Sequence, residues 1–168
     1  MKGFIVRIMG VSTFCSLVVL VNAASFPTFA QPALQAPAVR LVWMGGADCP
    51  PCVAWRALER PKLQKSAEFK GVTFSYVPKV IRSSVPPGFF LPTEVKPHKE
   101  KLDYASSGRG GSPQAALLVN GEVVDYFHGT RSAEQIEAML AAVRTGGPYP
   151  FERCLKVSVR WGKCEIPG

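Results

Sequence analysis

Residues 39–55 have the sequence VRLVWMGGADCPPCVAW, and they decide the fold of this chain. The run Val39–Met44 is almost entirely apolar and is closed by two glycines, which predicts a buried strand. Pro50 and Pro51 follow, and proline suits the first turn of a helix because that turn leaves its N–H groups unbonded. The stretch therefore predicts a strand, a short loop and a helix whose N-terminus carries two cysteines.

These cysteines, Cys49 and Cys52, have the spacing of a redox-active dithiol pair. Such a site needs two cysteines close enough to bridge, one of them exposed and partly ionised. The N–H groups and the dipole of a helix N-terminus favour a thiolate at Cys49, whereas the charge of Asp48 opposes it. We expect Cys49 to be the attacking nucleophile and Cys52 the resolving thiol, with a potential set by these opposed effects.

The first residues predict export. The basic residues Lys2 and Arg7 precede an uncharged, mostly apolar run, Ile8–Val21, and small residues follow this run. We therefore expect a signal peptide over residues 1–24. Cleavage after Ala23, Ala24 or Ala30 would deliver a periplasmic or extracellular protein with no stable membrane insertion. The apolar run is shorter than the roughly 20 residues of a membrane-spanning helix. An uncleaved anchor that starts nearer Phe4 is the alternative.

Composition and charge narrow the class of protein. Hydrophobic residues make up 47% of the 168 residues and charged residues 19%, which is typical of one globular domain with a core. Removing Lys2 and Arg7 with the signal peptide lowers the formal net charge from +8 to +6. The other basic residues are scattered among acidic ones and form no stripe with aromatic residues, so we expect no nucleic-acid partner.

Further elements follow after residue 55. We expect a helix broken or kinked at Pro61, a second helical stretch over Leu63–Phe69, and a polar helix over His98–Ala105. Pro, Ala and Gln dominate residues 25–37, which we interpret as a linker before a domain at 38–147 and an extension at 148–168. We also expect these elements: a strand at Val72–Val77, strands at Ala115–Val119 and Glu122–Phe127 joined by Asn120-Gly121, and a last helix capped by Ser132 and Gln135.

The order β-α-β, insert, β-β-α predicts an α/β fold with a mixed sheet. The insert before residue 112 carries Phe89, Phe90 and Leu91, which either pack on the core or form an exposed surface for a partner. Trp43 and Trp55 are expected in the core.

Several features of residues 39–144 resemble features of thioredoxin, and they follow one another in the same order. They are Trp43, the Cys49-Pro50-Pro51-Cys52 motif that opens a helix, Ser112-Pro113 before a strand, the Asn120-Gly121 hairpin, and Gly129 before the last helix. The resemblance implies a three-layer α/β/α fold, a cis peptide bond at Pro113 beside the disulfide, and backbone groups of Ser112 offered to a substrate peptide. It implies no cofactor beyond the cysteine pair.

Two departures from thioredoxin affect the site. Asp48 stands where thioredoxins have an aromatic residue, and the strand Leu41–Met44 lacks their buried acid. The resemblance thus implies thiol–disulfide exchange with proteins outside the cytosol, recycled by a redox partner that the sequence does not identify.

Cys154 and Cys164 complete an even set of four, because Cys15 lies within the predicted signal peptide. A structural disulfide that closes the tail is one interpretation, and a second redox pair that relays electrons to Cys52 is another. A zinc site of all four cysteines, or a copper site that adds Met44, is a further alternative, although the second pair lacks the spacing of a metal site. Three hypotheses of function follow: an oxidoreductase, a binding module with a static disulfide, and a metal-delivery protein.

Overall fold

The computed structural model describes residues 36–158 and Cys164. The predicted signal peptide and most of the predicted linker lie outside these residues. The elements follow in the order β1 (Val39–Gly45), α1 (Pro50–Lys65), β2 (Thr73–Pro78), η1 (Gly88–Phe90), η2 (Lys96–His98), α2 (Lys99–Ser106), β3 (Gln114–Val119), β4 (Glu122–His128) and α3 (Ala133–Thr145).

The strands form a mixed sheet in the order β2-β1-β3-β4. β1 pairs with β2 in parallel, and α1 is the crossover between them, while β1–β3 and β3–β4 are antiparallel. Gln114, the first residue of β3, lies opposite Met44 near the end of β1 and opposite His128 at the end of β4. The loop after β1 and the loop before β3 therefore meet at one edge of the sheet, which we call the Gly45 edge.

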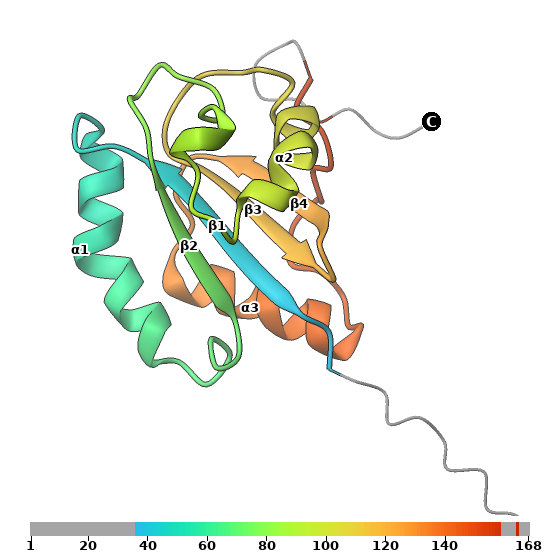
Figure 1. Ribbon diagram of the computed structural model, residues 1–168. Helices are drawn as coiled ribbons and strands as arrows, with labels where there is room; N and C mark the ends of the chain where they lie inside the picture. Colours follow the sequence, from blue (N-terminus) through green and yellow to red (C-terminus); the bar gives the residue numbers. More distant parts are fainter. Residues whose placement is uncertain (1–35, 159–163, 165–168) are drawn as a thin grey trace, which may run out of the picture. The chain divides into compact units, whose positions relative to one another are not determined.

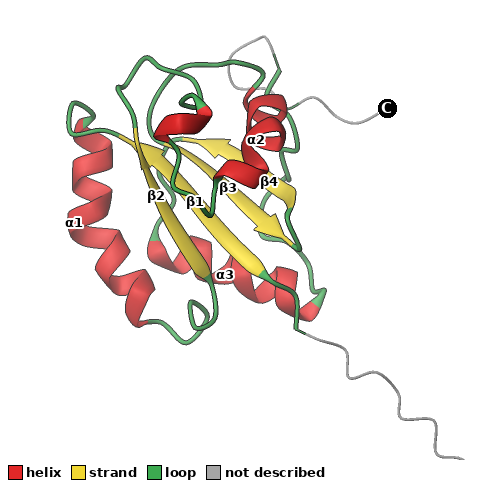
Figure 2. Cartoon of the chain, viewed as in Figure 1, coloured by secondary structure: helices red, strands yellow, loops and turns green. Residues whose placement is uncertain are grey.

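Helices cover both faces of the sheet, which gives the α/β fold its three layers (Figure 1, Figure 2). On β1, Leu41 and Trp43 pack with residues of α1 and α3, whereas Val42 and Met44 pack with residues of α2 and of the insert. A strand that is buried on both faces needs a nearly continuous apolar run. This explains the composition of Val39–Met44 and confirms that Trp43 and Trp55 belong to the core.

Of the break or kink predicted at Pro61, the break is wrong. α1 continues through Pro61 to Lys65 and ends there, short of the predicted Phe69. A proline within a helix removes one backbone hydrogen bond, and packing of the helix face can offset this loss. Trp55 and Leu63, which flank Pro61 on the buried face of α1, both lie in the core beside α3.

The hairpin and the last helix agree with the sequence. Asn120 and Gly121 have φ angles of 51° and 82°, as a turn between twisted antiparallel strands requires. Ser132 and Gln135 form the predicted capping box at the start of α3. Strong local patterns of this kind predict structure well because neighbouring residues alone satisfy them.

The insert is divided between core and solvent. Val85, Leu91 and Val95 are buried in the cluster on the α2 side of the sheet. Phe89 and Phe90 are 74% and 64% exposed. Leu91 therefore packs on the core, as one interpretation of the insert has it. Phe89 and Phe90 lie at the surface, as the other interpretation requires.

A buried carboxylate fixes the C-terminal extension to β4. The fully buried Asp125 accepts hydrogen bonds from Arg131 Nη1 at 2.6 Å, Tyr149 Oη at 2.9 Å and the backbone N–H of Cys154 at 3.0 Å. The carbonyl of Cys154 in turn accepts from the backbone N–H of Tyr126 at 2.7 Å. Cys154 is also bonded to Cys164, as predicted for the tail.

We predict that Asp125→Asn lowers the free energy of unfolding by about 3 kcal/mol, because it leaves Arg131 facing an uncharged group in a buried position. Urea denaturation followed by circular dichroism measures the change. Asp103→Asn is the matched control, since Asp103 pairs with Lys99 at the surface and the loss is expected to stay below about 1 kcal/mol. Equal losses in both variants would contradict this role of Asp125.

Candidate active site

The cysteine pair lies where β1 passes into α1 at the Gly45 edge. β1 ends at Gly45, and Cys49 is the N-cap of α1 with extended backbone angles, φ −116° and ψ 99°. Pro50 and Pro51 occupy the first two helical positions, as predicted. Cys49 and Cys52 form a disulfide with their Cα atoms 5.2 Å apart.

One backbone donor of the helix N-terminus is directed at the Cys49 sulfur. Pro50 and Pro51 have no N–H, so the first one available in α1 belongs to Cys52. It donates to Cys49 Sγ at 3.3 Å, while the N–H of Val53 donates to the Cys49 carbonyl at 3.0 Å. Once Cys49 is reduced, this N–H and the helix dipole favour its thiolate.

Both cysteines are fully buried, which corrects the expectation that one of them is exposed. Asp48 and Pro50, on either side of Cys49, are exposed. The disulfide holds Cys49 Sγ over the first turn of α1 toward Cys52, and Cys52 lies against the backbone of Gly45. Opening the disulfide removes this constraint on the Cys49 sulfur.

Gly45 has no space for a side chain. A Cβ atom at this position would lie 2.7 Å from Cys52 Sγ, 3.1 Å from Cys52 Cβ and 3.5 Å from Trp43 Nε1. The first of these distances is shorter than a van der Waals contact, so glycine is required for the close approach of α1 to the end of β1. The structure thus brings Trp43 and Cys52 together on one side of Gly45.

Asp48 anchors the loop after β2. One oxygen of its carboxylate accepts a hydrogen bond from the backbone N–H of Ile81 at 3.0 Å. The backbone N–H of Lys79 donates to the carbonyl of Gly45 at 3.2 Å, so two bonds join this loop to the segment between β1 and α1. Asp48 therefore has a positional role beside the motif in addition to its charge.

Lys79 is a buried cation at the Gly45 edge, and sequence reasoning missed it. The residue is 7% exposed. Its Nζ atom donates to the carbonyl of Ser83 at 2.5 Å and to the carbonyl of Ser84 at 3.4 Å. Burial lowers the pKa of Lys79 to about 8. A lysine directly after a strand that runs parallel to β1 was the available signal, because the carboxyl ends of parallel strands share an edge.

His128 lies at the same edge, at the end of β4. Burial lowers the pKa of His128, and the positive charges of Lys79 and Arg109 lower it further. In thioredoxin the corresponding surroundings contain a buried acid, which β1 lacks here. Two positive charges thus act on His128 at the Gly45 edge.

The peptide bond between Ser112 and Pro113 is cis, as the resemblance implies. The carbonyl of Pro113 accepts from the backbone N–H of Gly129 at 2.9 Å, and Pro113 directly precedes Gln114, which lies opposite Met44. The hydroxyl of Ser112 is buried without a hydrogen-bond partner. Ser112 and Pro113 thus lie at the Gly45 edge, where the predicted substrate-binding role places them, and that role stays a prediction.

The second disulfide belongs to another part of the fold. Cys154 packs in the cluster on the α2 side, and Val157 beside it donates its N–H to the carbonyl of Ala105 in α2. The four cysteines thus form two separate disulfides and not one ligand set. In the part of the chain that the structure describes, three or more side chains able to bind a metal do not cluster anywhere.

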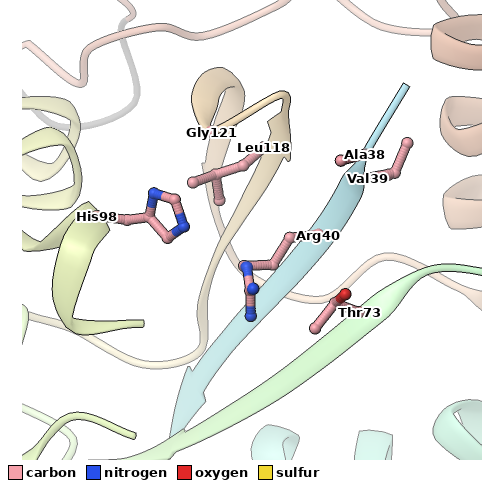
Figure 3. A pocket seen from close by; sticks show the side chains of 7 residues that line it. All are labelled: Ala38, Val39, Arg40, Thr73, His98, Leu118 and Gly121. Carbon is pink, nitrogen blue, oxygen red and sulfur yellow. The ribbon is translucent and has the colours of Figure 1, made fainter. Parts of the chain in front are cut away.

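A small cavity lies at the opposite end of the sheet (Figure 3). It is lined by the first residues of β1 and β2, among them Arg40 and Thr73, and by His98 and Gly121. Burial lowers the pKa of His98, with smaller contributions from Arg40 and Lys101. Because β1 starts at this cavity and ends at the cysteine motif, the cavity is not part of the candidate active site.

Three features of the chain itself define the class of fold. They are a mixed sheet with the order β2-β1-β3-β4, a disulfide of the CxxC type at the N-terminus of the crossover helix, and a cis bond immediately before β3. Together they make this a thioredoxin-like fold with a CxxC site.

Two thioredoxins are among the known structures that are similar to this chain. One is thioredoxin-2 of the malaria parasite, a component of its protein secretion machinery, with 17% sequence identity and a TM-score of 0.42 over 62% of this chain and 82% of that one. The other is the reduced form of the periplasmic thioredoxin SoxS from Paracoccus pantotrophus, with 17% identity and a TM-score of 0.41 over 64% of this chain and 96% of that one. No protein-family model matches the chain, and no curated protein matches its sequence.

We predict that Gly45→Ala destabilises the protein by roughly 1–3 kcal/mol and slows formation of the Cys49–Cys52 bond, because the added methyl group meets Cys52 Sγ. Urea denaturation and thiol counting during reoxidation measure the two effects. Gly88→Ala is the control, since a Cβ there meets no atom within 4 Å. If both variants behave alike, Gly45 is not a close-approach position.

The burial of Lys79 predicts a dependence of stability on pH. Since its pKa in the folded protein is about 8, below the ordinary value of 10.5, the unfolded chain binds more protons between pH 8 and pH 10.5. The free energy of unfolding should rise with pH across this window, relative to Lys79→Met, which lacks the group.

Urea denaturation of both proteins at several pH values measures this difference. Lys65→Met, which removes an exposed lysine, is the control and should follow the unmodified protein. Parallel curves for the unmodified protein and Lys79→Met would show that the Lys79 ammonium is not desolvated.

Proposed function

We propose that this protein is an exported thiol–disulfide oxidoreductase that exchanges disulfides with protein thiols through Cys49 and Cys52. The observation that carries the proposal is the disulfide at the N-terminus of α1, where the N–H of Cys52 points at Cys49 Sγ. Cys49 is the nucleophile, because a helix N-cap favours its thiolate. Cys52, which lies against Gly45, is the resolving thiol.

Grooves and exposed apolar side chains around the motif support a protein substrate. Two open grooves flank it, one lined by Asp48, Lys79 and Val80, the other by Pro51, Leu58 and the loop before α3. Ser112 offers backbone groups beside Pro113 at the same edge. The exposed Phe89 and Phe90 add apolar surface of the kind that protein partners contact.

Export is supported by the pattern of residues 1–24 and by the second disulfide, Cys154–Cys164. Structural disulfides form and persist in oxidising compartments. Of the helices that the structure describes, none has the length and apolar character to cross a bilayer. A periplasmic or extracellular site of action, with a separate redox protein to recycle the pair, follows from the proposal.

A thioredoxin-fold binding module with a static disulfide is the second candidate. The observation in its favour is the complete burial of both Cys49 and Cys52. The two functions differ in reduction potential, because structural disulfides have potentials below about −300 mV and exchanging ones lie above it.

We predict that the Cys49–Cys52 pair equilibrates with a glutathione redox buffer and that its potential lies above about −300 mV. Cys52→Ala should trap a mixed disulfide with glutathione or with a protein thiol through Cys49, detected by mass spectrometry. A potential below this value, together with no trapped species, would favour the static module.

Two variants serve as controls for trapping. The double variant Cys49→Ala/Cys52→Ala should trap nothing. Cys154→Ser/Cys164→Ser should keep the exchange of the first pair, and loss of exchange in this variant would instead support the electron-relay interpretation of the second pair.

A further inference from the structure

The indole N–H of Trp43 is a buried donor without a hydrogen-bond partner. Trp43 is fully buried, and its Nε1 atom has no acceptor within hydrogen-bonding geometry. A buried polar group that lacks a partner costs about 1–3 kcal/mol, so its persistence needs a reason.

The neighbours of this N–H indicate the reason. Around the position of a Cβ at Gly45, the nearest atoms are Cys52 Sγ and Cβ, followed by Trp43 Nε1 at 3.5 Å. The unpartnered donor and the sulfur of the resolving cysteine therefore both lie within 3.5 Å of the point where a side chain of Gly45 would begin. In the disulfide, Cys52 Sγ is bonded to Cys49 and is a poor acceptor.

Packing holds the indole ring of Trp43 in place. It stacks on the ring of Trp55 with centroids 3.7 Å apart and planes at 10°. The two rings differ in their polar atoms, because Trp55 Nε1 donates to the carbonyl of Arg131 at 2.8 Å. One tryptophan of the stack thus has a hydrogen-bond acceptor, and the other has an unpartnered donor near Gly45 and Cys52.

We propose that the indole N–H of Trp43 donates a hydrogen bond to Cys52 Sγ when the Cys49–Cys52 disulfide opens, and that it stabilises negative charge on this sulfur. The proposal rests on the proposed function and adds a residue to it. The sulfur of a free cysteine, and above all of a thiolate, is a better acceptor than a disulfide sulfur, so the bond favours the reduced and mixed-disulfide states over the oxidised state.

The bond acts in the second step of exchange. In the first step, Cys49 thiolate attacks a substrate disulfide, forms the mixed disulfide and releases one substrate thiolate. In the second step, Cys52 thiol gives its proton to that released thiolate, and Cys52 Sγ attacks Cys49 Sγ, which breaks the mixed disulfide and releases the second substrate thiolate. Two electrons pass from the dithiol to the substrate, and the Trp43 N–H keeps its proton throughout.

This role is suited to a site without a buried acid. The indole N–H can lower the energy of the Cys52 thiolate, but it cannot accept the proton that Cys52 loses. The proton must therefore leave through the substrate or the solvent. Trp43 is thus a donor to the reacting sulfur and not a general base.

We expect Trp43→Phe, which keeps an aromatic ring and removes the donor, to shift the equilibrium with glutathione roughly three- to tenfold toward the disulfide. A tenfold shift corresponds to a potential about 30 mV more negative. Trp55→Phe is the matched control, because it removes the other N–H of the same stack, and its potential should not change. No shift in Trp43→Phe, or equal shifts in both variants, would overturn the proposal.

A second measurement is made on the unmodified protein, and variants serve only to assign its resonances. In ¹⁵N-labelled protein, reduction of the pair with a phosphine should move the indole N–H resonance of Trp43 downfield and leave that of Trp55 in place, the two being assigned with the variants above. An unchanged Trp43 resonance would overturn the proposal. If the pair fails to exchange with glutathione while this resonance moves, the proposed function fails and the hydrogen bond stands.

Discussion

The close approach of Cys52 to Gly45 is the constraint on which the rest of the site depends. Because Gly45 has no side chain, the first turn of α1 lies directly against the end of β1. The sulfur of Cys52 is therefore close to the backbone of Gly45. The same approach leaves the Cys52 sulfur and the indole nitrogen of Trp43 among the atoms nearest to the place of a Gly45 side chain.

The surroundings of the pair differ in charge from those that thioredoxin implies. β1 supplies an indole where an acid is expected, and a buried lysine lies at the end of the neighbouring strand β2. Asp48, the acidic residue nearest the motif, is bound to the N–H of Ile81. Positive groups and neutral donors favour thiolates over thiols, whereas the negative charge of Asp48 opposes them.

The parts of the structure that the sequence predicted are those fixed by neighbouring residues. The apolar run of β1, the Asn120-Gly121 turn and the Ser132 cap each satisfy a local requirement, and each was placed correctly. The path of α1 through Pro61 was not, because packing of Leu63 in the core outweighs one lost hydrogen bond. The burial of Cys49 and the buried ammonium of Lys79 were also missed, since both result from contacts between segments far apart in the chain.

The carboxylate of Asp125 has a consequence for where the folding unit ends. Two of its three partners, Tyr149 and Cys154, come after residue 147, where the domain predicted from the sequence ends. A fragment cut at that point would have a charged group in its interior with only Arg131 beside it. The segment that carries Tyr149 and Cys154 is therefore part of the folding unit, because it supplies two of the hydrogen bonds that compensate a buried charge.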